Sequence, residues 1–424
     1  MKLIRTISKT PLFKVTSLNS VSVLLKIGTG LITSKVLAIF VGPGGMALVG
    51  NLRNFLSSAE TVSTLGFQNG IVKYVVDHKD DEERLRKIIS TVFISLLTAT
   101  LLLSVILFVC ASYFSQLIFD ANDQLAVIFK VLALLLPWYA TTVFLLALIN
   151  GLGKFRNVIY INIFGNVLGL LFSVFMIWKF QTFGALLSII VPPSLLFFVA
   201  FYYVNQEIRF LRQVSFAAFE WKIIRDLSEY SLMTLLATFV GPLVYLAIRN
   251  NAIANIGIAQ AGYWEAMNRI STYYLMFVSS ILSLYFFPKL TLAKSNQSTR
   301  EVFRSYYKGI FPLFAIALVV VYFLRFVVVA LLFTPAFLPT TKLFFWQLLG
   351  DVFKAASLIL GYQFFAKKLT AAFVLTELFS LAMLYGFSRY FMSLFGIEGI
   401  VMAHALTYFV YLLVLIVYFR KSFF

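Results

Sequence analysis

Twelve apolar stretches, each long enough to cross a bilayer, follow one another along the chain. A membrane-spanning helix needs about 20 mostly apolar residues, and no series of short alternating segments indicates a transmembrane β-barrel. The pattern predicts an all-α integral membrane protein with twelve transmembrane helices. The predicted spans cover residues 17–40, 46–76, 88–112, 126–150, 156–178, 183–204, 228–250, 260–286, 305–333, 343–365, 370–390 and 397–419.

Basic residues gather on alternate connections between these spans. Because loops rich in Lys and Arg stay on the cytoplasmic side, both termini are predicted to be cytoplasmic, which requires an even number of spans. The N-terminal segment lacks the compact apolar core of a cleaved signal, so we expect it to be a cytoplasmic start. The opposite side carries mainly Lys179, Lys342 and Arg389. The basic side carries Lys2, Arg5, Lys9, Lys14, Lys79, Arg84, Arg86, Lys87, Lys154, Arg156, Arg209, Arg212, Lys222, Arg225, Lys289, Lys294, Arg300, Arg304, Lys367, Lys368, Arg420 and Lys421.

The composition narrows the class of protein. Hydrophobic residues make up 61% of the chain and charged residues 12%, against about 45–50% and about 25% in soluble domains, which excludes a water-soluble enzyme. One cysteine and two histidines leave no internal disulfide and no metal site rich in thiolate or histidine. We therefore expect no metal and no cofactor. The net charge of +18 is attributed to the cytoplasmic loops, and no nucleic-acid partner is expected.

The chain also repeats itself with a period near 215 residues. PGGMALVGNLRNF at the second span is matched by AQAGYWEAMNRIS at the eighth, and Gly184 is matched by Gly399. Six spans in each half give both halves the same orientation, and transporters commonly bind substrate where such repeats meet. We expect two six-helix lobes, residues 1–212 and 213–424.

Ionisable residues fall inside the predicted spans, where each costs about 2.5–3.5 kcal/mol on insertion scales unless it faces water or a partner. Lys26 has no acidic residue at helical spacing, and Arg53 has only Glu60, two turns away. These two basic residues are the strongest candidates to line a water-filled lumen. Basic residues outnumber acidic ones among the intramembrane charges, which favours an anionic ligand.

The other intramembrane charges leave two interpretations open, since each is either a satisfied structural group or part of a site. The sequence favours an interfacial, snorkelling position for Arg249 and a packing role for His404. A further carboxylate, Glu377, lies in the eleventh predicted span. Two oppositely charged pairs stand at helical spacing, Glu265 with Arg269 and Asp351 with Lys354.

Three segments resemble a known family. They are LLKIGTGLITSKVLAIFVGPGGMALVGNLRNF (24–55), GIVKYVV (70–76) and FFWQLLGDVFKAASLILGYQFFAKK (344–368). They are similar to the Wzx-type flippases of the multidrug/oligosaccharidyl-lipid/polysaccharide exporter (MOP) superfamily, in particular those that serve enterobacterial common antigen and O-antigen synthesis. The resemblance covers nearly the whole chain in order. It implies twelve helices in two six-helix lobes around a V-shaped central cavity, the fold shared with the MATE exporters.

The resemblance implies a function as well. Such a protein moves an undecaprenyl-diphosphate-linked oligosaccharide from the cytoplasmic to the periplasmic leaflet of the bacterial inner membrane by alternating access. Its partners would be that substrate, membrane lipids and candidate glycan polymerase and chain-length machinery. Lys26 and Arg53 would contact the diphosphate, with Arg269 and Lys354 assisting from the second lobe. Glu60, Glu265, Asp351 and Glu377 would tune these cations or carry a coupling ion, and Asn51 and Gln347 match the family motif as supporting polar groups.

Two other functions compete with this hypothesis. A multidrug/cation antiporter of the same fold would rely on intramembrane acids and be indifferent to Lys26. A membrane enzyme such as a glycan polymerase or ligase would need catalytic groups on large loops, whereas the connections here are short. The chain also lacks the spacing of a phosphate-binding loop, which disfavours an ATP-driven pump.

Overall fold

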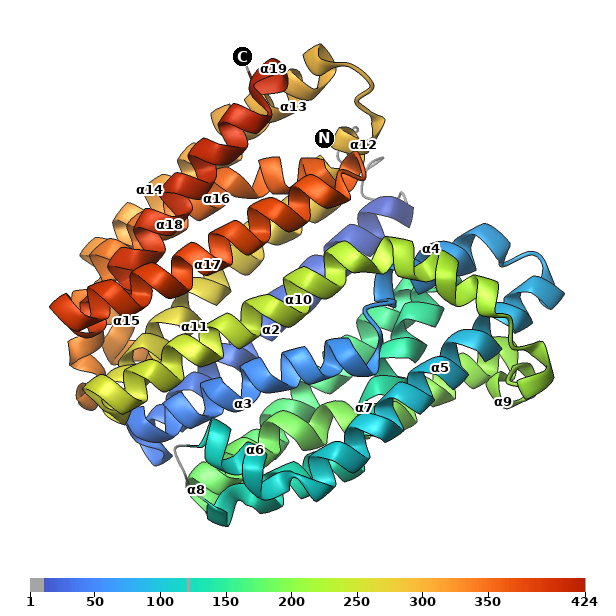
Figure 1. Cartoon of the computed structure of the whole chain (residues 1–424), viewed down its shortest axis with the longest axis horizontal. Helices are drawn as coiled ribbons and strands as arrows, with labels where there is room; N and C mark the ends of the chain where they lie inside the picture. The colour runs from blue at the N-terminus through green and yellow to red at the C-terminus, as the bar shows by residue number, and fades with distance from the viewer. Residues whose placement is uncertain (1–10, 120–122, 424) are drawn as a thin grey trace. The chain divides into compact units, whose positions relative to one another are not determined.

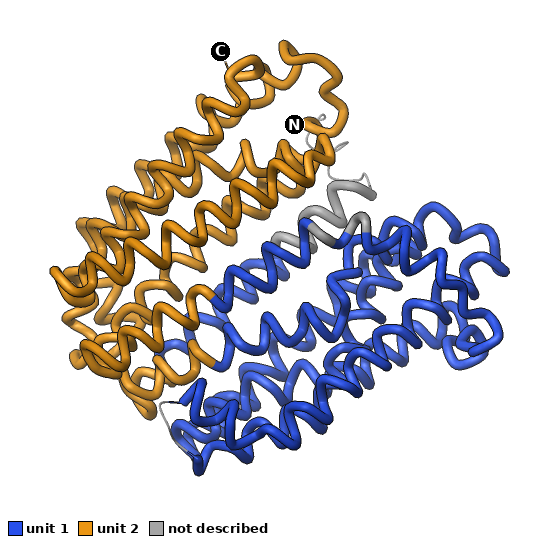
Figure 2. Tube along the Cα trace, viewed as in Figure 1, with its two compact units in different colours: residues 1–36, 52–243 blue, residues 37–51, 244–424 orange. Residues whose placement is uncertain are grey.

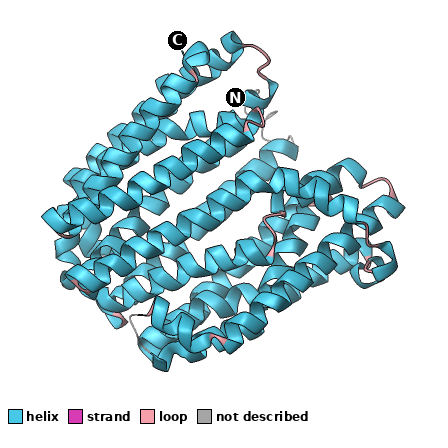
Figure 3. Cartoon of the chain, in the orientation of Figure 1, coloured by secondary structure: helices cyan, strands magenta, loops and turns pink. Residues whose placement is uncertain are grey.

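The computed structural model describes residues 11–119 and 123–423, without the side chains of 11–20, 229, 230 and 232. Within these residues the chain consists of helices and short connections, with no strand (Figure 3). The predicted all-α class is therefore confirmed. The basic residues Lys2, Arg5 and Lys9 of the predicted cytoplasmic start lie outside the described residues.

Ten helical segments of the described chain are long and apolar enough to cross a membrane, so the protein is a multi-pass membrane protein. The fifth and sixth predicted spans fall in one helix, α8 (Phe155–Ile208), whose 54 residues include a non-helical Gln181. A straight helix of that length would measure about 80 Å, far more than the roughly 30 Å of a hydrocarbon core. The break at Gln181 therefore divides α8 into two segments of spanning length.

The second predicted span is not one helix. α3 (Gly42–Ser63) ends before a turn at Thr64–Phe67, and α4 (Gln68–His78) follows it. Leu65 and Gly66 both have positive φ in this turn (53° and 64°), which no α-helix tolerates. The expectation of a continuous helix over 46–76 is therefore wrong, and α3 is not among the ten candidate spans.

The chain divides into two compact units, coloured in Figure 2. Unit 1 comprises Met1–Val36 and Leu52–Leu243, and unit 2 comprises Leu37–Asn51 and Val244–Phe424. α2 (Pro11–Phe40), α3 and α10 (Trp221–Ile256) each contribute residues to both units. Unit 1 extends past residue 212 to Leu243, so a lobe boundary at 212/213 stays a proposal.

Unit 1 is built on α7, which packs against α4, α5, α6 and α8. Its core holds aromatic and aliphatic side chains such as Phe144, Leu148 and Ile161. These buried side chains hold α4, α7 and α8 together. The same helices carry the polar residues of unit 1 described below. The elements of unit 1 not yet given are α5 (Glu82–Val109), α6 (Ala111–Ile118), η1 (Asp123–Leu125), α7 (Ala126–Gly151), α9 (Phe210–Gln213) and η2 (Phe216–Ala218).

Helices α16 and α18 pack against each other at the centre of unit 2, and α18 also packs against α17 (Figure 1). Gly350 on α16 stands against the backbone of Ala405 on α18, where an added Cβ would lie 3.0 Å from Ala405 Cα. Small residues allow this close helix approach in membranes. The elements of unit 2 are α11 (Ile258–Ile281), η3 (Leu282–Phe286), α12 (Phe287–Leu292), α13 (Asn296–Lys308), α14 (Ile310–Phe323), α15 (Arg325–Leu332), η4 (Pro335–Leu343), α16 (Phe344–Ala366), α17 (Thr370–Phe395), α18 (Ile397–Tyr418) and α19 (Arg420–Phe423).

Local backbone geometry repeats at the predicted period. Gly184 would place a Cβ 1.9 Å from Met176 O, and Gly399, 215 residues later, would place one 2.2 Å from Phe391 O. Positive φ angles recur in pairs at the same separation. The paired positions are Gly42 (φ 72°) with Gly257 (97°), Gly153 (77°) with Lys368 (55°), and Gln181 (49°) with Gly396 (60°). Each pair marks equivalent turns in the two halves, as the internal repeat predicts.

Candidate functional site

Three buried charged residues of unit 2 gather at Glu265 together with two asparagines. We call this set the arginine cluster: Asn51, Arg249, Asn250, Glu265 and Arg269. Arg249 donates from Nη2 to Glu265 Oε2 at 2.6 Å and from Nη1 to Asn51 Oδ1 at 3.2 Å. Arg269 donates from Nε to Glu265 Oε1 at 3.2 Å, and Asn51 donates to Asn250 Oδ1 at 2.7 Å. Two guanidinium groups thus share one carboxylate.

The local sequence explains how this carboxylate reaches both arginines. A Cβ on Gly50 would lie 2.5 Å from Glu265 Oε2, so glycine leaves the space that the carboxylate occupies. A Cβ on Gly262 would lie 1.9 Å from Pro43 O, which brings the start of α3 against α11 within unit 2. The PGG and AQAG motifs therefore form the seam that supports the arginine cluster.

Arg249 does not snorkel, and the expectation of an interfacial position is wrong. Arg249 is only 1% exposed. Its guanidinium pairs with Glu265 and stacks on Trp264, with Cζ 5.2 Å from the ring centre. The pairing of Glu265 with Arg269 is present, but Glu265 is shared with a second cation.

A second buried network in unit 2 surrounds Asp351, which is 0% exposed. Its Oδ2 accepts hydrogen bonds from Ser271 Oγ at 2.6 Å and from the hydroxyl of Tyr274. Its Oδ1 lies 3.0 Å from His404 Nε2, and Gln347 Nε2 lies 3.3–3.4 Å from the carboxylate. The hydroxyl and amide donors stabilise the ionised carboxylate away from water.

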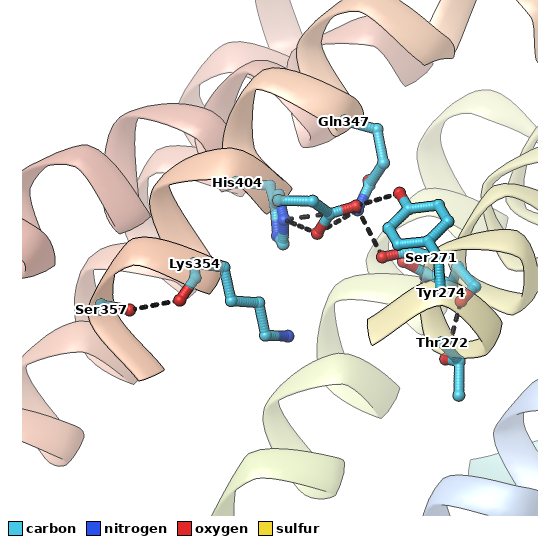
Figure 4. A network of polar contacts seen from close by, with 9 residues as sticks. Ser271, Thr272, Tyr274, Gln347, Lys354, Ser357 and His404 are labelled. Atoms are coloured by element: carbon cyan, nitrogen blue, oxygen red, sulfur yellow. Dashed lines mark hydrogen bonds and ion pairs between the residues drawn. The ribbon is translucent and has the colours of Figure 1, made fainter. Parts of the chain in front are cut away.

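Figure 4 shows Gln347, His404, Ser271 and Tyr274 converging, whereas the Lys354 side chain extends apart from them. Lys354 holds its Nζ 4.9 Å from the centre of the Tyr408 ring. Asp351 thus contacts His404 rather than Lys354, and the interpretation of Asp351 and Lys354 as a self-satisfying pair is wrong. His404 is buried, and its ring nitrogen is satisfied by the Asp351 carboxylate and the Gln347 amide, in agreement with a packing role.

Tyr408 and Tyr411 link these groups to Glu377. The Tyr408 ring packs edge-on to His404 at 4.8 Å between centres and lies 6.4 Å from the Tyr411 ring. Tyr411 donates to Glu377 Oε2 at 3.4 Å. The four predicted residues Gln347, Asp351, Lys354 and Glu377 are therefore connected, through tyrosines that the sequence analysis did not single out.

The remaining predicted residues belong to unit 1. Lys26 on α2 and Arg53 on α3 are exposed. Glu60 on α3 accepts hydrogen bonds from Gln68 Nε2 at 2.9 Å and from the hydroxyl of Tyr139. Lys26, Arg53 and Glu60 thus belong to unit 1, whereas the two buried networks belong to unit 2.

The sequence did not indicate four hydroxyl partners of the acidic residues: Tyr139, Ser271, Tyr274 and Tyr411. Ser271 and Tyr274 are three residues apart on α11, a spacing that places them on one helical face. That spacing was a usable signal, whereas nothing in the sequence links Tyr139 to Glu60. Among the described residues, no group of three or more His, Cys, Asp or Glu side chains is placed to hold a metal ion.

The fold is shared with known transporters. An inward-facing multidrug resistance MATE family transporter of the MOP superfamily matches with a TM-score of 0.74 at 14% identity, over 94% of each chain. The lipid II flippase MurJ in its inward closed conformation matches with a TM-score of 0.71 at 16% identity, over 97% of this chain and 89% of that one. The chain thus has the fold of these MOP-type membrane transporters.

The family follows from the sequence match. Residues 12–293 match the family described as polysaccharide biosynthesis protein, and the chain belongs to that family. Two relatives, the lipid III flippases of Escherichia coli (strain K12) and Shigella flexneri, are each 29% identical over 394 residues. The alignments cover 92% of this chain and 94% of the relatives.

Proposed function

We propose that this protein is a flippase that moves an undecaprenyl-diphosphate-linked oligosaccharide from the cytoplasmic to the periplasmic leaflet of the bacterial inner membrane. One observation carries the proposal: Arg249 and Arg269 are buried at a single shared carboxylate, Glu265. Two buried guanidinium groups in a low-dielectric setting favour an anionic ligand. The similarity to lipid III flippases over nearly the full length supports a lipid diphosphate as that anion.

Each proposed role follows from charge. Lys26 and Arg53 of unit 1 and Arg269 and Lys354 of unit 2 hold the diphosphate, since guanidinium forks and ammonium groups both bind phosphate oxygens. Asn51 and Gln347 keep Arg249 and Asp351 in position. The acidic residues tune the cations or carry a coupling ion: Glu60, Glu265, Asp351 and Glu377.

The finer substrate assignment rests on similarity alone. A lipid III unit or an O-antigen repeat unit is the proposed cargo, with glycan polymerase and chain-length machinery as candidate partners. Alternating access through twelve spans, with both termini cytoplasmic, completes the proposal.

Charge reversal of the exposed cations tests this function. Lys26→Glu and Arg53→Glu should each abolish glycan export, because an anionic side chain repels the diphosphate. The measurement is export of the cell-surface glycan in cells that lack the endogenous flippase, with protein level in the membrane confirmed. Lys79→Glu, on an exposed loop position, is the matched control. Export that survives both reversals would rule out the cationic mechanism.

The multidrug/cation antiporter is the second candidate. It is favoured by the TM-score of 0.74 with a MATE transporter and by the buried carboxylate of Asp351. It predicts drug resistance that depends on Asp351 and is unaffected by Lys26→Glu. Drug-susceptibility assays on the same strains therefore separate the two functions.

A further inference from the structure

Unit 1 contains a polar cavity of about 330 Å³. Its wall is drawn from α3, α4, α7 and α8, and its polar lining residues are Glu60, Gln68, Asn69, Asn150 and Asn162. One carboxylate and four side-chain amides thus line a single cavity between helices that are mostly apolar. Asn69 and Asn162 are exposed and Gln68 and Asn150 are half-buried, so these amides are accessible to a polar ligand that enters the cavity.

The amides are positioned to bind a ligand. Glu60 receives hydrogen bonds from Gln68 and Tyr139, which fix the Gln68 amide against α3. The Asn69 amide nitrogen lies 3.5 Å from Thr234 Oγ1, at the limit of hydrogen bonding. Within the described part of the chain, no hydrogen bond is recorded for the side chains of Asn150 and Asn162, which leaves their donors and acceptors for a ligand.

The chemistry of the lining selects the ligand class. An amide offers both donors and an acceptor, which matches hydroxyl and acetamido groups, each of them donor and acceptor. None of the described lining residues is basic, so the cavity has no partner for a phosphate. The remaining wall includes Val72, Val143, Leu146 and Val158, an aliphatic surface for the C–H face of a sugar ring.

Size and position agree with a single sugar. Pockets for small molecules have volumes from about 300 Å³ upward, so this cavity has room for one sugar residue rather than a whole oligosaccharide. Asn150 stands four residues before Lys154, and Asn69 stands one helical turn before Lys73. Lys154 belongs to the side predicted to be cytoplasmic, so the cavity adjoins a basic position at which a diphosphate would lie next to the bound sugar.

We propose that this cavity is a glycan-recognition subsite that binds one sugar residue of the lipid-linked oligosaccharide through Gln68, Asn69, Asn150 and Asn162. The inference rests on the proposed flippase function and adds to it a second contact, separate from the cations that hold the diphosphate. Discrimination among glycans follows, because a site built to hydrogen-bond hydroxyl groups rejects ligands that lack them.

Asn150→Leu and Asn162→Leu test the subsite, since leucine keeps the approximate volume and removes the hydrogen bonds. The matched control is Asn205→Leu at an exposed position of α8. The purified full-length protein is titrated calorimetrically with the soluble glycan released from the host's own lipid-linked oligosaccharide. In liposomes, transport is measured for that lipid and for sugar-free undecaprenyl diphosphate.

We expect each cavity variant to bind the glycan about threefold to tenfold more weakly and to transport the glycosylated lipid correspondingly less. The same variants should transport sugar-free undecaprenyl diphosphate like the wild type, which also shows that they fold. Equal loss for both lipids, or no loss for either, overturns the subsite. Sodium binding by the same variants is titrated as well, and its loss with unchanged glycan binding identifies an ion site and overturns the glycan subsite.

Failure of the flippase function itself gives a different result. The wild-type protein would then move neither lipid, while its glycan binding and the effect of the asparagine variants on that binding would still be measurable.

Discussion

The buried charges of unit 2 depend on one another at the level of single residues. Glu265 accepts from Arg249 and from Arg269, so its carboxylate is the group that makes two buried cations tolerable. Removing one member of a buried ion pair costs about 3–5 kcal/mol, because the remaining charge is left uncompensated. The anion of this cluster is therefore more sensitive to substitution than other intramembrane acids.

Glu265→Gln should lower stability strongly, whereas Glu377→Gln should have little effect. Glu377 is only partly buried, and among the described residues it has a single long hydrogen bond, from Tyr411 at 3.4 Å. The measurement is the temperature at which half of the detergent-solubilised protein remains monodisperse. Similar thermal stability of the two variants would contradict a structural role for the Glu265 carboxylate.

The sequence identified most of these residues but not their partners. Glu265 and Arg269 pair at helical spacing as expected, because i, i+4 neighbours meet on any helix. The Arg249 partners Glu265 and Asn51 lie 16 and 198 residues away, and Asp351 meets His404 across 53 residues. Such pairs depend on helix packing, which spacing along one helix does not report.

At the level of elements, apolar length predicted where helices run but not where they break. Spans such as 343–365 and 397–419 correspond closely to α16 and α18, since long apolar stretches define their own limits. The turn after α3 and the join inside α8 depend on backbone angles at Leu65, Gly66 and Gln181. Leu and Gln give no sign of positive φ, so these two breaks could not be placed to the residue.

Gln181→Gly should stabilise the break in α8. Gln181 has φ 49° and ψ −124°, close to the 60° and −137° of its repeat partner Gly396. A non-glycine residue in such a region costs about 1–3 kcal/mol. Thermal unfolding in detergent should therefore show a higher midpoint for Gln181→Gly and a lower one for Gly396→Gln.

The reciprocal pair provides the check on this prediction. If Gln181→Gly lowers the midpoint, the glutamine side chain itself stabilises the turn, and the backbone argument fails. Gly361→Ala, where an added Cβ meets nothing within 4 Å, controls for general effects of substitution in a helix.

At the scale of the whole molecule, the single cysteine provides a probe of orientation. Cys110 is exposed and lies at the end of α5, which corresponds to the third predicted span. With a cytoplasmic N-terminus, the end of that span faces the periplasm. The proposed topology therefore makes a specific statement about which side of the membrane this thiol reaches.

Cys110 should react with a membrane-impermeant maleimide added to intact spheroplasts. In a Cys110→Ser background, Lys79→Cys should react only after the membrane is permeabilised, because residue 79 lies on the predicted cytoplasmic side. Labelling is measured by the gel shift of the modified protein. The opposite pattern would reverse the orientation, and equal labelling of both positions would contradict a single orientation.

The paired turns have a consequence for how substitutions in this chain should be interpreted. Positions 42 and 257, 153 and 368, and 181 and 396 adopt positive φ at a constant separation of 215 residues. Each pair therefore faces the same steric requirement, although at two of the three pairs only one member is glycine. The substitutions tolerated at one member of each pair in a saturation mutagenesis survey should therefore also be tolerated at the other member, even where the native amino acids differ.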